Sequence, residues 1–413
     1  PQDVDPLVQS MLGPNVIPPP LISFDGPSNI AGVSPPDPVG DVGPNHYLAM
    51  SNLYTAMYLK DGTLVWGPFP NNTIWSGFGG SCETSNSGDP IVVHDQMADR
   101  WMLTQFALAG SPEFICIALS TGPDPTGTYY RYAINTCSRL PDYPKFGVWP
   151  DAYYISSRDF QGSFVGIGAY AMNRAQMLVG DPNPDIISFL IPPGSQPYNV
   201  GDGLLPSDMD GFMPPPAGSP NYFMGSMDDG GQYGAPIDAL TLWEFDADFA
   251  NPPNSSLTLV DTIPVAPFDS QFPCSPTSRS CIPQPDTSNK VDILSYRQRP
   301  MWRLAYRNFG SHEALVTNQS VEAAPNMAGV RWYEIRDPGG TPTIYQQGTY
   351  APGVGDGIHR WMGSIAMDGA GNMALGYSAS DATATYPSVW YTGRLASDPL
   401  GTMPQGEGSI ING

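Results

Sequence analysis

One eleven-residue pattern occurs twice in this chain, about a hundred residues apart. DVGPNHYLAMS spans residues 41–51 and GVWPDAYYISS spans residues 147–157, and both keep the order Val, any residue, Pro, two residues, Tyr and an apolar run that ends on Ser. Recurrence of a short pattern at long intervals is typical of repeat architectures, in which each repeat is one supersecondary unit. The phrase therefore predicts a chain built from successive copies of a small strand-based unit.

Weaker versions of the phrase divide the rest of the chain. Each combines a short apolar strand, a turn and a longer strand that begins near an aromatic residue. Together with the two copies above, these patterns mark the starts of the repeat units. The starts lie at residues 41–51, 88–108, 147–157, 219–227, 304–320 and 365–380. Further strand patterns follow each start, and repeated four-stranded units predict an all-β fold, a single β-propeller of six blades. Five or seven blades, or a pair of two-sheet sandwiches, are the alternatives.

The composition agrees with many short strands joined by many turns. The 47 Pro and 45 Gly are spread along the chain instead of forming low-complexity tracts, and 41% of the residues are apolar, which is enough for a large core. We expect residues 1–30 to be an N-terminal extension and residues 31–413 to be the propeller. Within the extension, LISFDGPSN at residues 21–29 is expected to complete the last blade and to close the ring, which would protect edge strands.

The charge of the chain excludes nucleic acid as a partner. Its 39 acidic residues against 17 basic ones give a formal net charge of −22, which repels nucleic acid and anionic lipid. No apolar run approaches the roughly 20 residues of a membrane span, and we expect a secreted chain whose leader has been removed. Asp outnumbers Glu by 32 to 7. This excess mainly indicates turns, which Asp caps, and it also suits Ca²⁺ as a cofactor.

The five Cys residues favour an extracellular disulfide protein. They form no C-x-x-C pair and no Cys/His cluster, which argues against zinc, haem and iron–sulfur sites. Cys274 and Cys281 flank a loop rich in Pro and Ser and are spaced to close a small ring, so we predict that they are bonded. We also predict a bond between Cys82 and Cys116, which leaves Cys137 unpaired.

Several phrases resemble a group of secreted bacterial propeller-like proteins. The phrases are PPDPVGDVGPNHYLAMSN, GDPIVVHDQMADRWMLTQF, DYPKFGVWPDAYYISS, MWRLAYRNFGSHEALV and HRWMGSIAMDGAGNMALGYS. The likeness covers most of the chain, residues 33–403, and implies a secreted all-β protein. Because no single activity characterises the group, the resemblance assigns no catalytic residues.

The residues just before each first strand are the candidate functional groups. In a propeller these positions meet at one mouth of the central channel. The acidic candidates for catalysis come early in the chain and are Asp37 (or Asp41), Asp89 and Asp142. The basic candidates for substrate binding are Lys145, Arg297, Arg299, His359 and Arg360. Two carboxylates suit hydrolysis of a glycosidic bond and cations suit an anionic sugar, whereas the alternatives are ordinary turn residues and Asp–Arg pairs that tie blades together.

Weaker patterns concern metal, sugar stacking and glycosylation. PSDMDG at residues 206–211 places Asp208 and Asp210 two apart with a Gly behind them, as in part of a calcium-binding loop, and makes them the metal candidates. Trp66 and Trp75 are candidates for a sugar-stacking platform, whereas the Trp residues of the strands are expected in the core. N-glycosylation frames start at Asn71, Asn254 and Asn318.

These observations support two functions. The first prediction is a non-enzymatic module, extracellular or at the cell surface, for adhesion or for binding a glycan or surface polymer. The alternative is a carbohydrate-active hydrolase that uses the carboxylates at the channel mouth. The G-x-S-x-G, H-E-x-x-H and P-loop motifs do not occur in the sequence, which argues against the corresponding enzyme classes. A propeller hosts either function, so the geometry of the site has to distinguish them.

Overall fold

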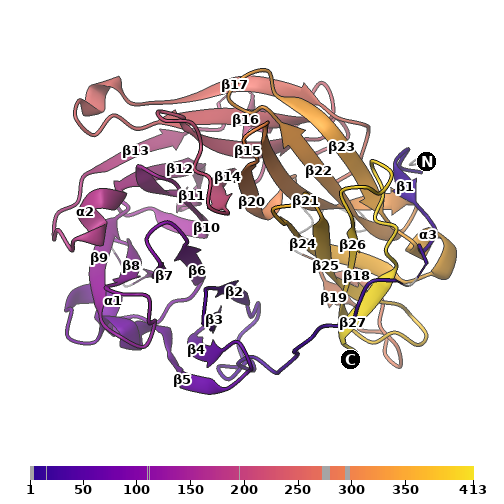
Figure 1. The fold of residues 1–413 in the computed structure, drawn as a ribbon, viewed down its shortest axis with the longest axis horizontal. Helices are drawn as coiled ribbons and strands as arrows, with labels where there is room; N and C mark the ends of the chain where they lie inside the picture. Colours follow the sequence, from indigo (N-terminus) through magenta and orange to yellow (C-terminus); the bar gives the residue numbers. More distant parts are fainter. Residues whose placement is uncertain are drawn as a thin grey trace. The chain divides into compact units, whose positions relative to one another are not determined.

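Small antiparallel sheets follow one another along the chain in the computed structural model, which describes residues 4–14, 16–108, 110, 112–194, 196–271, 280–293 and 298–413. The protein is all-β and has a β-propeller arrangement of four-stranded sheets (Figure 1). It divides into two compact units. The first unit comprises Leu21–Pro192 and Ala247–Ser255, and the second comprises Pro1–Pro20, Pro193–Asp246 and Ser256–Gly413.

The first unit contains three four-stranded sheets. The first is made of β2 (Val39–Val42), β3 (His46–Ser51), β4 (Tyr54–Leu59) and β5 (Leu64–Pro70). The second is made of β6 (Ile91–Asp95), β7 (Arg100–Ala107), β8 (Phe114–Ser120) and β9 (Tyr129–Asn135). The third is made of β10 (Leu140–Val148), β11 (Ala152–Gln161), β12 (Ser163–Asn173) and β13 (Ile186–Ile191). Short helices in this unit are η1 (Asn71–Trp75), α1 (Gly80–Thr84), α2 (Arg174–Leu178) and η3 (Pro252–Asn254).

The second unit contains three further sets of four consecutive strands. The first set is β14 (Leu205–Asp210), β15 (Asn221–Met227), β16 (Ala239–Asp246) and β17 (Ser256–Pro264). The second set is β20 (Met301–Asn308), β21 (Glu313–Ala324), β22 (Met327–Arg336) and β23 (Thr343–Tyr350). The third set is β24 (His359–Met367), β25 (Met373–Ser380), β26 (Ser388–Arg394) and β27 (Glu407–Ile411). The remaining elements are β1 (Val8–Gln9), β18 (Ser280–Ile282), β19 (Val291–Asp292), η2 (Pro197–Asn199) and α3 (Gly353–Asp356).

The six four-stranded sets of the described residues coincide with the six starts predicted from the repeated phrase. Five of the starts fall on the first two strands of a set, the start at residues 219–227 falls on the second strand, β15, and successive strands of a set are neighbours in the sheet. The turn DGAGN between β24 and β25 shows why the pattern works. The Asp368 side chain accepts hydrogen bonds from the Ala370 and Asn372 backbone N–H groups, and Gly371 adopts a φ of 84° that suits a residue without a Cβ.

The set that begins with β14 departs from a simple meander. β14 pairs with β15 only at Leu205 and Pro206, and its residues Ser207–Asp210 then pair in parallel with β20. At the point of departure, the Asn221 side chain accepts from the Ser207 N–H and donates to the Ser207 carbonyl oxygen. The amide of Asn221 thus replaces the backbone partner that β14 leaves, so the backbone groups of Ser207 stay satisfied. This crossover joins two neighbouring sets into one sheet.

Aromatic residues fill the core of the first unit, together with a disulfide bond. Trp101 has no exposed surface and packs in a cluster with Leu48, Val92 and the two bonded cysteines. Cys82 of α1 and Cys116 of β8 form the predicted disulfide, with their Cα atoms 5.7 Å apart, and Cys137 is a free, exposed thiol, also as predicted. The predicted Cys274–Cys281 bond falls on a residue outside the described part of the chain, because Cys274 is not among the described residues.

The N-terminal segment differs from the prediction of a closing strand at residues 21–29. These residues form no strand. Instead β1 pairs in parallel with β23, and the Val16 and Ile17 backbone N–H groups donate to the Gln405 carbonyl oxygen at 3.1 and 2.8 Å. The N-terminal segment therefore does reach the last set of strands, but through residues 16 and 17. Leu21 is fully exposed, which shows that the apolar residues of the predicted strand bury too little surface to hold it in a sheet.

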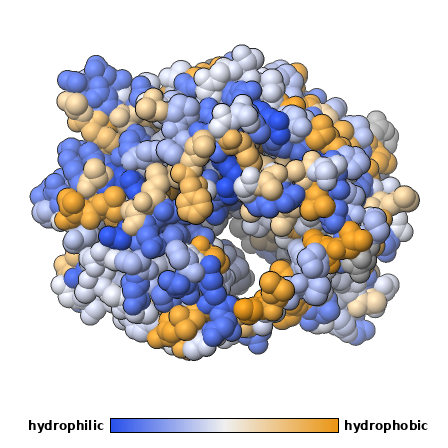
Figure 2. Space-filling view, viewed as in Figure 1, coloured by the Kyte–Doolittle hydropathy of each residue, from blue (hydrophilic) through white to orange (hydrophobic). Residues whose placement is uncertain are grey.

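Hydrophilic residues dominate the face drawn in Figure 2, and apolar residues form patches between them. The apolar side chains of Leu21 and Phe212 are fully exposed, and those of Met11 and Val179 are mostly exposed. None of the helices in the described ranges is long and apolar enough to cross a membrane.

Candidate active site

In the first unit, the first strands of the three four-stranded sheets begin close to one another. Asp37 lies two residues before β2, Asp89 lies two residues before β6, and Asp142 is the third residue of β10. β6 contacts both β2 and β10 (Figure 1). Asp89 is electrostatically coupled to Asp37, to Asp142 and to Lys145. The structure thus brings together the three predicted carboxylates and one predicted cation, at the strand positions from which they were predicted.

Asn52 connects the first carboxylate to the second. It lies in the tight turn between β3 and β4, and only 8% of its surface is exposed. Its Nδ2 donates to Asp37 Oδ2 at 2.9 Å, and its Oδ1 accepts from the Asp89 backbone N–H at 2.8 Å. A Cβ on Gly88 would lie 2.6 Å from Asn52 Oδ1, closer than a real contact allows. The glycine before Asp89 therefore gives the Asn52 amide the room it needs to hold both residues.

A β-bulge in β10 directs the backbone of this strand toward Asp89. The pairing of β10 with β11 shifts between Asp142 and Lys145, and Tyr143 adopts a φ of 54° there. The bulge turns the Tyr143 backbone N–H toward Asp89, whose Oδ2 accepts from it at 3.3 Å. Lys145 Nζ lies 3.5 Å from the centroid of the Tyr143 ring and donates to the Pro144 carbonyl oxygen. The bulge therefore supplies the site with a backbone donor and an ammonium held over an aromatic ring.

Three non-glycine residues of the site have left-handed backbone conformations. The φ angles are 39° at Asp37, 43° at Asp89 and 54° at Tyr143. Such conformations cost on the order of 1 kcal/mol or more for a residue with a Cβ, and they persist only where the surroundings enforce them. Here the Asn52 amide and the bulge of β10 enforce them. This concentration of strained residues marks the cluster as a functional candidate.

Because of burial, the pKa of Asp89 differs from that of an ordinary carboxyl group. Burial, followed by the neighbouring Asp37 carboxylate, raises the pKa of Asp89 to about 7. Asp142 adds to the rise, while Lys145 and the Tyr143 N–H oppose it. Near neutral pH a large fraction of Asp89 is therefore protonated and able to donate a proton.

Asp142 faces a second cation. Its carboxylate lies 3.9 Å from Arg158, which is its pairing partner across β10 and β11. The Arg158 guanidinium also lies 5.3 Å from the ring centroids of Phe160 and Phe164. The aromatic rings and the carboxylate hold this guanidinium beside the cluster, and Arg158 is a cation that the sequence did not single out.

The arrangement suits general acid–base catalysis at a bond between uncharged groups. A half-buried carboxyl with a pKa near 7 beside a second carboxylate is the pattern in which one group donates a proton while the other acts as base or nucleophile. Two positioning residues, Asn52 and Tyr143, were missed at the sequence level. Asn52 reads as an ordinary turn residue, and Tyr143 contributes its backbone N–H, which leaves no trace in a sequence pattern.

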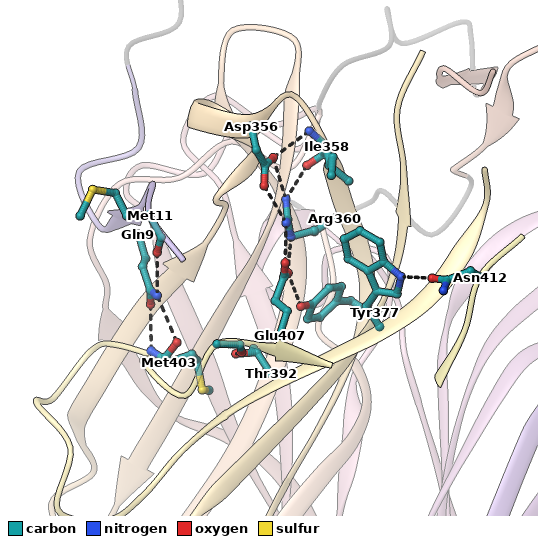
Figure 3. Close-up of polar contacts among 12 residues, drawn as sticks. Gln9, Met11, Asp356, Ile358, Arg360, Tyr377, Thr392, Met403, Glu407 and Asn412 are labelled. Atoms are coloured by element: carbon teal, nitrogen blue, oxygen red, sulfur yellow. Dashed lines mark hydrogen bonds and ion pairs between the residues drawn. The ribbon is translucent and has the colours of Figure 1, made fainter. Parts of the chain in front are cut away.

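Arg360 has a structural role in the second unit. Its side chain has no exposed surface. Its Nε and Nη2 donate to the Glu407 carboxylate of β27 at 2.6 and 2.8 Å, and Nη1 and Nη2 donate to the Asp356 carboxylate of α3 (Figure 3). The prediction of a substrate-binding arginine does not fit a guanidinium enclosed by two carboxylates. The alternative tie to Asp37 or Asp41 is also replaced, because the partners of Arg360 belong to the last set of strands and to α3.

The other predicted cations of the second unit are also buried or not described. His359 is 7% exposed, and burial lowers its pKa to about 4, so it is neutral at pH 7 and a poor partner for an anionic sugar. Arg299 is 5% exposed. Arg297 lies outside the described residues. Among the predicted cations that the structure describes, Lys145 is the one that interacts electrostatically with Asp89.

The predicted metal ligands Asp208 and Asp210 face an arginine. Both carboxylates of β14 form ion pairs with Arg303 of β20, and the distance to Asp210 is 2.9 Å. A guanidinium occupies the position between the two carboxylates that a cation would otherwise take. Their spacing of two residues reflects one face of a strand rather than a calcium-binding loop.

Two smaller expectations are also corrected by burial. Trp75 has no exposed surface and packs in the core of the first unit, so it presents no open platform for a sugar, whereas Trp66 is partly exposed and packs against the same core. Among the N-glycosylation frames, Asn71 and Asn318 are fully buried, whereas Asn254 is exposed. Only Asn254 is accessible to a glycosylating enzyme in the folded chain.

No protein-family model and no curated protein sequence matches this chain. Several solved structures are similar in fold. A GH43 endo-arabinanase from Bacillus licheniformis is 11% identical at a TM-score of 0.32, with 75% of this chain and 96% of that chain covered. An endo-1,5-α-L-arabinanase from Thermotoga petrophila is 14% identical at a TM-score of 0.34, with coverages of 88% and 74%. At TM-scores this low, the likeness is no basis for transferring an activity to this chain.

Proposed function

We propose that this protein is a glycoside hydrolase and that the cluster around Asp89 is its active site. One observation carries the proposal. Asp89 is a half-buried carboxyl whose pKa is raised to about 7, and it shares its site with Asp37, whose own position is fixed by the Asn52 amide. Cleavage of a glycosidic bond requires one carboxyl group that donates a proton and a second that acts as base or nucleophile.

The roles follow from the contacts. Asp89 is the general acid, which gives its proton to the glycosidic oxygen as the bond to the leaving sugar breaks. Asp37 is the partner carboxylate, which removes a proton from the attacking water or itself attacks the anomeric carbon. Lys145 interacts electrostatically with Asp89, Arg158 lies 3.9 Å from Asp142, and both cations would bind substrate oxygens or an acidic sugar. The Cys82–Cys116 disulfide supports an extracellular setting, where polysaccharides are the abundant substrates.

The test measures the release of reducing sugar from a panel of neutral and acidic polysaccharides. Asp89→Asn removes the proton donor and Asp37→Asn removes the partner carboxylate, so each should lower kcat about 10²–10⁴-fold with a smaller effect on KM. Asp61→Asn is the matched control, because Asp61 is an exposed turn residue that caps Thr63 outside the cluster. It should retain wild-type activity.

A glycan-binding module is the second candidate, and one observation favours it. Lys145 and Arg158 are each held against aromatic rings beside carboxylates, which is also a way to bind a sugar without cleaving it. If the wild type binds polysaccharide in affinity electrophoresis but releases no reducing sugar, and if Asp89→Asn weakens that binding, the hydrolase proposal is wrong and the binding module is supported.

A further inference from the structure

Three carboxylates gather at one loop of the second unit, far along the chain from the Asp89 cluster. Asp228 and Asp229 directly follow β15, and Asp238 directly precedes β16, so all three belong to the loop that connects these strands. One oxygen from each lies within 4.8 Å of the others. Oxygen ligands lie about 2.3–2.6 Å from Ca²⁺, so ligands on opposite sides of one ion are about 5 Å apart. The separation of the carboxylates therefore fits a single ion.

Backbone donors hold the two buried carboxylates in place. Asp238 Oδ1 accepts from the Asp229 N–H at 2.9 Å, and Asp238 Oδ2 accepts from the Phe268 N–H at 3.1 Å. Asp228 Oδ2 accepts from the N–H and the hydroxyl of Ser270 at 2.8 and 2.6 Å. These contacts fix the carboxylates from two loops at once. A ligand set that is already positioned loses little conformational freedom when an ion binds.

A buried amide oxygen beside the loop provides independent evidence. Gln298 is 2% exposed, and its Nε2 donates to the Ser226 carbonyl oxygen at 3.0 Å. Its Oε1 is buried and has no hydrogen-bond partner among the described residues. A Cβ on Gly231 would touch both Gln298 Oε1, at 2.5 Å, and the Asp228 Cβ, at 3.1 Å, so this oxygen points into the carboxylate loop. An amide oxygen is a common ligand of Ca²⁺.

Two further acids increase the negative charge around the loop. Burial, and then the charges of Asp228 and Asp229, raise the pKa of Asp269. Burial, and then Asp269, do the same to Glu322. A divalent cation at the loop would offset this repulsion.

We propose that Asp228, Asp229, Asp238 and the amide oxygen of Gln298 bind one Ca²⁺ ion. Water completes the coordination on the exposed side, where Asp229 lies. Ca²⁺ is favoured over Mg²⁺ because Mg²⁺ demands a tight octahedral arrangement at about 2.0–2.1 Å and sheds its water reluctantly, which an uneven ligand set of this width does not match. The site is independent of the Asp89 cluster and of the proposed hydrolase activity.

Isothermal titration of the chelator-treated full chain with CaCl₂ tests the proposal. The expected result is saturable binding of one ion per chain and a thermal midpoint that rises with CaCl₂. Asp229→Asn should weaken the binding at least tenfold and reduce the Ca²⁺-dependent rise in Tm. Asp229 is exposed and Asn is isosteric, so the variant should fold. Asp248→Asn, at a partly exposed aspartate of a different hairpin loop, should bind Ca²⁺ like the wild type.

Two results would overturn the site. One is the absence of a binding heat and of a Tm change in the wild type at millimolar CaCl₂. The other is wild-type affinity in Asp229→Asn, which would place the ion elsewhere. Gln298→Ala is a second variant, and its unchanged affinity would remove the amide oxygen from the ligand set and with it the proposal as stated.

Discussion

At the residue scale, the candidate active site depends on positions that a sequence pattern reveals and on contacts that it does not. Asp37, Asp89 and Asp142 were predicted because each stands at the start of a first strand, and such starts converge in a propeller. Asn52 and Tyr143 were not predictable. Their contributions are a turn amide that reaches 37 residues along the chain to Asp89 and a backbone N–H exposed by a bulge. Arg360 was predicted to bind substrate, because a sequence does not show whether a guanidinium is enclosed by carboxylates.

The raised pKa of Asp89 predicts a pH-dependent effect on stability. Its pKa in the folded protein, about 7, exceeds the unfolded value of about 3.9, so folding favours the protonated form. The stabilisation is complete below pH 4 and is lost as the pH rises through 7. Asp89→Asn cannot ionise, and it should therefore stabilise the protein at pH 8 by on the order of 1–2 kcal/mol relative to its effect at pH 5.

Urea unfolding of wild type and Asp89→Asn at pH 5 and pH 8 measures this difference, because other titrating groups cancel in the comparison. Asp61→Asn should show no such dependence on pH. If Asp89→Asn shifts the unfolding free energy equally at both pH values, Asp89 is an ordinary ionised carboxylate and its role as an acid is lost.

At the element scale, hairpins were predictable where turn chemistry and strand pattern agree. DGAGN between β24 and β25 and the Asp95 turn between β6 and β7 both use an Asp side chain to accept backbone N–H groups. The crossover of β14 to β20 was not predictable, since it depends on the Asn221 side chain substituting for a strand. The strand expected at residues 21–29 does not form, because an apolar pattern forms a strand only where a partner sheet covers it.

The ion pairs of Arg360 connect elements of the last set of strands, and their loss should be costly. Arg360→Ala leaves the largely enclosed Glu407 carboxylate and the more exposed Asp356 carboxylate without their cation (Figure 3). We expect a loss of about 3–5 kcal/mol of unfolding free energy. Chemical denaturation measures it, and Lys60→Ala, at an exposed lysine, is the control. An unchanged stability together with weakened polysaccharide binding would instead support the original assignment of Arg360 to a ligand site.

At the scale of the whole molecule, the repeated phrase was sufficient to predict the fold class, an all-β propeller, while it left the number of blades open between five, six and seven. The reason is physical: every set must satisfy the same strand–turn–strand geometry, so the same residue types recur at the same positions. Function does not recur in this way. Among the described residues, the carboxylate cluster around Asp89 belongs to the first unit and the acidic loop after β15 to the second, and both combine residues that are distant in sequence.

The net charge of −22 predicts that salt stabilises the protein. Like charges spread over a surface repel one another, and ions at about 0.15 M screen this repulsion beyond about 8 Å. Buried pairs such as Arg331–Asp5, with both side chains almost fully enclosed, are screened much less. We therefore expect Tm to rise by a few degrees between about 20 and 200 mM NaCl, measured with EDTA present so that divalent cations do not contribute. The double variant Asp61→Asn/Asp248→Asn removes two negative charges, at the exposed Asp61 and the partly exposed Asp248, and should show a smaller rise. A Tm that falls with NaCl would mean that attractive ion pairs outweigh the net repulsion, and the acidic surface would then carry no general cost to the folded state.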